Sequence, residues 1–94
     1  MSYALAIAPE AEADLTRLIE SLPRGRRDRA WDAVRGELNK LAANPGLAVR
    51  STLDRPTYRF RFVLDNVGYH WGATFRYAAD EQTIVITHIF RIPL

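Results

Sequence analysis

The sequence contains no cysteine, one methionine and a single lysine, Lys40, among its 13 basic residues. Without cysteine the chain cannot form disulfides or thiolate metal sites. No apolar run is long enough to span a membrane, and none has the pattern of a signal peptide. These absences predict a cytoplasmic protein without a membrane partner.

Length and charge further restrict the class of protein and its partners. At 94 residues, the sequence predicts one domain, 1–94, large enough to bury roughly 60–65% of its unfolded surface without a metal or disulfide. The formal net charge is only +2, but every basic residue except Lys40 is arginine, whose planar fork suits phosphate or carboxylate. This bias is compatible with RNA, DNA or an acidic protein as partner. A GC-rich genome would explain it equally well.

The C-terminal part is predicted to form three consecutive antiparallel strands. In the first, 58–64, strict alternation places Tyr58, Phe60 and Phe62 on one face and Arg59 and Arg61 on the other. Turn residues at 65–68 and 79–82 separate it from further runs at 69–77 and 83–91. The last run is apolar on both sides, which is typical of a central strand buried on both faces.

The basic residues of these runs are the candidate site residues. If they share a face, Arg59, Arg61 and Arg76 line one open surface of the sheet, which Arg91 can join, within reach of His70 or His88. Basic and imidazole side chains would then be concentrated on that surface.

The N-terminal half is predicted to contain a short strand at 2–8 and two helices. Pro9, with acidic residues after it, favours a helix start, and Pro23 ends that helix after about Ser21. Apolar residues at spacings of three and four from Ala30 indicate a second helix, which stops at 44–46. The short break between them requires an antiparallel hairpin. Residues 46–57 show no period and are predicted to form a loop that can include a short irregular strand.

The predicted order is therefore β-α-α-β-β-β, an α+β fold. An antiparallel four-stranded sheet carries the helical hairpin on one face, and the opposite face is left open. Leu15, Trp31 and Phe60 are expected to be largely buried.

Familiar catalytic motifs are missing, including phosphate-binding glycine loops, nucleophile elbows and metal-spaced histidines, so neither a cofactor nor a metal is predicted. Arginine and histidine on a sheet could still cleave RNA, because the 2′-hydroxyl needs a base and the phosphate needs cationic donors. Arg59, Arg61 and Arg91 could contact the phosphate, and His70 or His88 could transfer protons. A docking surface without chemistry accounts for the arginines equally well, and either histidine could be a surface or core residue.

The segments SYALAIAPEAEADLTRL, TYRFRF, GYHWGATFRY and TIVITHIFRI resemble the opening strand and helix and the three C-terminal strands of the RelE/ParE superfamily, toxins of bacterial type II toxin-antitoxin modules. The resemblance implies the fold of this superfamily, and it implies a cognate antitoxin as partner. It also implies a toxin function. RelE-type members cleave mRNA on the ribosome, whereas ParE-type members inhibit DNA gyrase.

Position by position, Arg61 matches an active-site arginine of the RelE branch, and Arg91 matches the arginine near the end of its last strand. His70 stands where many of these nucleases have an arginine, and the chain lacks their C-terminal tyrosine. The resemblance thus implies a metal-independent, ribosome-associated mRNA endoribonuclease. A gyrase inhibitor or a catalytically inactive binding protein of the same fold remains open, and so does the question of whether the protein is an enzyme.

Overall fold

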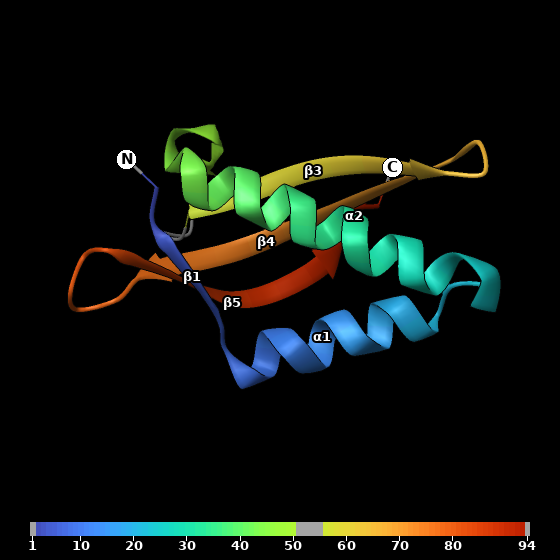
Figure 1. Cartoon of the computed structure of the whole chain (residues 1–94), viewed down its shortest axis with the longest axis horizontal. Coiled ribbons are helices and arrows are strands. Elements are labelled where there is room, and N and C mark those ends of the chain that lie inside the picture. Colours follow the sequence, from blue (N-terminus) through green and yellow to red (C-terminus); the bar gives the residue numbers. More distant parts are fainter. Residues whose placement is uncertain (1, 51–55, 94) are drawn as a thin grey trace.

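The structure, a computed structural model, describes residues 2–50 and 56–93. One mixed sheet has the strand order β1-β5-β4-β3-β2, and two helices accompany it (Figure 1). In chain order the elements are β1 (Ala4–Ile7), α1 (Pro9–Glu20), α2 (Arg24–Ala43), the 3-10 turn η1 (Pro45–Leu47), β2 (Val49–Arg50), β3 (Pro56–Leu64), β4 (Val67–Tyr77) and β5 (Thr83–Arg91). The predicted α+β class is confirmed.

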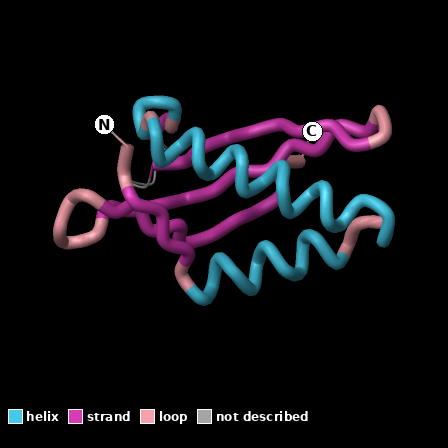
Figure 2. Tube along the Cα trace, in the orientation of Figure 1, coloured by secondary structure: helices cyan, strands magenta, loops and turns pink. Residues whose placement is uncertain are grey.

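The orientation of the first strand differs from the expected antiparallel four-stranded sheet. β1 pairs with β5 in parallel, with Leu5 opposite Ile84, and the two-residue β2 adds a fifth strand beside β3. The helical hairpin explains this orientation, because α2 returns the chain to the end of the sheet where β1 began (Figure 2). β3 therefore runs in the direction of β1, and two hairpins later β5 does so too. Residues 51–55 of the predicted loop lie outside the described residues.

A proline stands at the start of each helix. α1 starts at Pro9, as predicted, and carries Glu10 and Glu12 in its first turn, where the helix dipole favours negative charge. α2 starts at Arg24, directly after Pro23, and so includes a basic turn that precedes the apolar pattern. None of the described helices has the length and apolar character that a membrane span requires.

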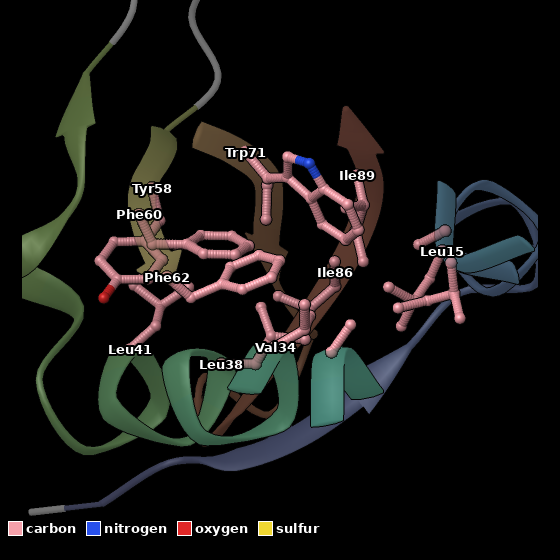
Figure 3. Packing of buried hydrophobic residues seen from close by; sticks show 14 of the residues in the cluster. Leu15, Val34, Leu38, Leu41, Tyr58, Phe60, Phe62, Trp71, Ile86 and Ile89 are labelled. Atoms are coloured by element: carbon pink, nitrogen blue, oxygen red, sulfur yellow. The ribbon is translucent and has the colours of Figure 1, made fainter. Parts of the chain in front are cut away.

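The core lies between the helices and one face of the sheet (Figure 3). The inner face of the sheet contributes aromatic side chains from β3 and β4 and isoleucines from β5, and the helices contribute mainly leucine and alanine. Leu15 and Phe60 are 3% and 6% exposed, as expected, whereas Trp31 is only partly buried at the margin of the core. Helices cover the inner face only, so the alternation of β3 places its arginines on the opposite, open face.

The β3–β4 hairpin closes through a two-residue turn at Asp65 and Asn66. Both residues have positive φ, 51° and 65°, the backbone signature of a type I′ turn. Gly68, which the sequence pattern placed in this turn, instead lies inside β4 opposite Val63. The turn geometry therefore does not explain why position 68 is a glycine.

A β-bulge interrupts the β4–β5 ladder. Thr74 is paired with His88 but the next residue, Phe75, is paired with Ile86, so Thr87 is the additional residue of β5. The hydroxyls of Thr74 and Thr87 are 2.7 Å apart. The bulge shifts the alternation by one residue, so that Ile86 and Ile89 both face the core. It also exchanges the faces of every later residue in β5.

Candidate functional site

The open face of β3 and β4 presents Arg61 directly opposite His70 in the antiparallel ladder. Arg61 lies between the buried rings of Phe60 and Phe62, so strand alternation directs its side chain away from the core. The carbonyl of His70 accepts a 2.8 Å hydrogen bond from the backbone N–H of Ile92. The strand pairing therefore holds the backbone of His70 on both sides.

A shallow hollow of about 310 Å³ lies over this pair and is called the open-face hollow below. Its lining consists of Arg59, Phe60, Arg61, His70 and Ile92. Arg61 leans along the sheet toward Gly68, where an added β-carbon would lie 3.1 Å from Nη2 of the guanidinium. Gly68 thus leaves room for the Arg61 side chain. The open-face hollow combines two arginines with one imidazole in a solvent-accessible position.

The three long strands contain four arginines and two histidines but no aspartate or glutamate. In the described parts of the chain, 2–50 and 56–93, Arg59, Arg61, Arg76 and Arg91 form no ion pair. Several helical arginines differ in this respect and bind carboxylates. The positive charge of the strands is therefore available to an external anion.

Arg91 does not share the open face with Arg59 and Arg61, contrary to the expectation that the basic residues of the strands lie on one face. Its ladder partner is the buried Trp71, so the bulge has turned Arg91 toward the helix side. There it lines a hollow with Leu18 and Tyr69. It also lines a larger depression of about 650 Å³ beyond the end of β5, to which His70 contributes from the open face. Arg91 is thus brought near His70 but is separated from the other two arginines.

His88 lies apart from the open-face hollow. Its imidazole is 52% exposed, and Nδ1 is 3.5 Å from Oδ2 of Asp14 in α1. The same carboxylate oxygen accepts the backbone N–H of Ile89 at 3.2 Å. Burial tends to raise the pKa of Asp14, but the Ile89 N–H and the partners Arg17 and His88 lower it overall. His88 is therefore neither a core residue nor a neighbour of Arg59 and Arg61.

The sequence pattern did not reveal a carboxylate clamp at the β3–β4 turn. Asp65 accepts hydrogen bonds from Arg29 at 2.8 and 3.1 Å and from Arg26 at 3.2 Å. Hydrogen bonds from Arg29, and then from Arg26, lower the pKa of Asp65. Arg26 also donates to the Tyr69 hydroxyl at 3.1 Å. The first turns of α2 are therefore tied to the hairpin that carries Arg61 and His70.

The part of the chain that the structure describes contains no cluster of three or more histidine, aspartate or glutamate residues that could bind a metal ion. The chemistry that the open-face hollow itself offers is cationic stabilisation of an anion by guanidinium groups, next to an imidazole that can accept or donate a proton.

The fold is similar to that of two solved structures from RelE toxin-antitoxin systems. The chain is similar to a crystal structure of the toxin-antitoxin complex RelBE2 from Mycobacterium tuberculosis, with 18% identity and a TM-score of 0.62 over 98% of this chain and 100% of that chain. It is also similar to the free toxin RelE from E. coli, solved as a double arginine-to-alanine mutant, with 14% identity and a TM-score of 0.53 over 97% and 84% of the two chains. No protein-family model matches the chain, and no curated protein matches its sequence.

Proposed function

We propose that this protein is the toxin of a toxin-antitoxin pair and acts as an endoribonuclease on mRNA. The observation that carries the proposal is the pairing of Arg61 with His70 in a solvent-accessible hollow on strands that contain no acidic residue. The RelE-like fold supports the toxin assignment.

The reaction that suits these groups is internal transfer at an RNA phosphate. The 2′-oxygen attacks phosphorus, the bond from phosphorus to the 5′-oxygen breaks, and the products are a 2′,3′-cyclic phosphate and a 5′-hydroxyl. Negative charge grows on the phosphate oxygens in the transition state, where the Arg61 guanidinium stabilises it. Arg59 lies two residues away on the same face and adds a second cationic donor. This chemistry uses protein side chains and solvent alone.

His70 is the group assigned to proton transfer. Among the described residues it is the imidazole that shares a hollow with Arg59 and Arg61, since His88 lies beside α1. In neutral form His70 accepts the 2′-hydroxyl proton, and water in the hollow supplies the proton to the leaving 5′-oxygen. Arg91 reaches the adjoining depression and contacts a flanking phosphate. His88 takes no part in the chemistry.

The partners follow from the same proposal. A cognate antitoxin neutralises the protein, in keeping with the RelBE2 structure, which is a toxin-antitoxin complex. The mRNA substrate is presented in the cytoplasm by the ribosome, which holds the single strand that an open, shallow face cannot enclose. The exposed arginines bind the mRNA and the ribosome through phosphate groups.

The test is induction of the protein in bacteria, with and without the product of the adjacent gene, followed by mapping of new mRNA 5′ ends. New ends that carry a 5′-hydroxyl and disappear in Arg61→Ala support the nuclease. A gyrase supercoiling assay runs beside it. If supercoiling is inhibited and no new mRNA ends appear, the protein is a gyrase inhibitor and not a nuclease. If neither effect is observed, it is a binding protein without either activity.

A further inference from the structure

The ring of Phe90 lies on the open face and covers Gly72. The two residues are paired across β4 and β5, and a β-carbon at Gly72 would lie 2.7 Å from Cζ and 2.9 Å from Cε2 of Phe90. Those distances are too short for any side chain larger than hydrogen. Glycine at position 72 therefore allows the ring to lie across β4, while 37% of Phe90 remains exposed to solvent.

Arg59 is paired with the same glycine from the other side, in β3. A row of Arg59, Gly72 and Phe90 thus crosses three strands of the open face. The neighbouring row contains Arg61 and His70, two residues further along each strand, at a spacing of about 7 Å. The exposed aromatic ring therefore lies in the row next to Arg61 and His70, outside the lining of the open-face hollow itself.

We propose that Phe90 is a stacking platform for one base of a single-stranded RNA whose phosphate is held at Arg61 and His70. This inference rests on the proposed nuclease function and adds a binding residue to it. Proteins that hold single-stranded nucleic acid combine a cationic surface along the backbone with aromatic rings on which bases stack. Strands without acidic residues match the charge of a polyanion, and Phe90 supplies the π-face that phosphate contacts alone lack.

A purely structural role would require only that Phe90 cover the backbone at Gly72. Leucine can provide apolar cover of that kind but cannot stack on a base. Phe90→Leu and Phe90→Tyr therefore separate the two roles, since tyrosine keeps the ring. Gly72→Ala is a third variant, because its methyl group would push the Phe90 ring away without removing it.

The experiment measures binding of a five-nucleotide RNA that carries 2′-O-methyl groups throughout, so that it cannot be cleaved. A second RNA is identical except for one abasic nucleotide, and this position is moved along the strand. At one position, loss of the base is expected to weaken binding to the wild-type protein by roughly 5- to 100-fold. Phe90→Leu should bind both RNAs equally, Phe90→Tyr should restore the difference, and Gly72→Ala should reduce it.

Two results would overturn the platform while leaving the proposed function intact. One is equal binding of intact and abasic RNA by the wild-type protein, with affinity lost in Arg61→Ala, which would show that the open face holds only the backbone. The other is an unchanged dependence on the base in Phe90→Leu. Failure of the wild-type protein to bind either RNA at low salt would also overturn the platform, whereas the nuclease, whose mRNA the ribosome presents, is then decided by the mapping of mRNA 5′ ends.

Discussion

Gly68 and Arg61 lie in contact on the open face, where a β-carbon on the glycine would be 3.1 Å from Nη2 and 3.3 Å from Nε of the arginine. Gly68→Ala should therefore shift the guanidinium by a few tenths of an ångström. Since the φ of Gly68 is not positive, alanine fits the strand and the melting temperature should change little. Cleavage should fall by about three- to tenfold, less than the 10²-fold that a misplacement of about 1 Å can cost. An unchanged rate would show that the position of Arg61 does not matter.

Arg61→Ala should abolish most cleavage and leave the fold intact. Loss of one charged donor to the transition state typically lowers the rate by roughly 10²–10³. Because the Arg61 side chain is exposed and forms no ion pair with any of the described residues, stability should stay within about 0.5 kcal/mol of the wild type. Arg35→Ala, an exposed arginine of α2, removes the same charge away from the open face and is the matched control. Equal losses in both variants would indicate a general charge effect.

The two histidines should behave differently. His70→Ala should lower cleavage by roughly 10²–10⁴, because it removes the proton acceptor of the open-face hollow. His88→Ala should leave the rate within about twofold, since its imidazole lies beside Asp14, outside the site. Single-turnover cleavage of one RNA by both variants makes the comparison. A large loss in His88→Ala with full activity in His70→Ala would exchange their roles.

The Asp65 clamp should contribute stability that depends on pH. Arg29 and Arg26 lower the folded-state pKa of Asp65 below its ordinary value of 3.8, so the contribution is complete above pH 3.8 and is lost as the pH falls through the folded-state value. Asp65→Asn keeps a residue that tolerates positive φ but removes the charge. Its melting temperature should be lower than that of the wild type at neutral pH and should converge with it in acid. A difference that persists unchanged in acid would contradict the clamp.

Tyr58→Phe should destabilise the fold. The Tyr58 hydroxyl donates to Oε2 of Glu37 at 2.7 Å, and burial, followed by this hydrogen bond, raises the pKa of the phenol. Hydrogen bonds to charged groups contribute about 1.5–3 kcal/mol, and we expect a loss in that range from urea unfolding. Phe62 lies on the same face but has no hydroxyl and therefore no such hydrogen bond. Its packing against Phe60 is unchanged in Tyr58→Phe. A loss below about 0.5 kcal/mol would show that water replaces the phenol at Glu37.

Local patterns were sufficient to predict several features of the fold. Pro9 predicted where α1 begins, and the alternation in 58–64 predicted that Phe60 and Phe62 are buried while Arg61 is exposed. Those features depend on helix-end chemistry and on the two-residue period of a strand, both of which act between near neighbours in the chain. The clamp between Arg29 and Asp65 could not be predicted in this way, since 36 residues separate its partners.

The sequence by itself determined which residues carry charge and which strands they lie on, whereas the tertiary structure decided which of them meet. Regular alternation from Ile84 and Ile86 would put Arg91 on the open face and Phe90 inside. The bulge at Thr87 reverses both, because it adds one residue between Ile86 and Ile89. That bulge is stabilised by partners distant in sequence, the hydroxyl of Thr74 and the carboxylate of Asp14 on the Ile89 N–H. A strand period is local, but its interruption depends on the neighbouring elements, and those are assembled only in the folded protein.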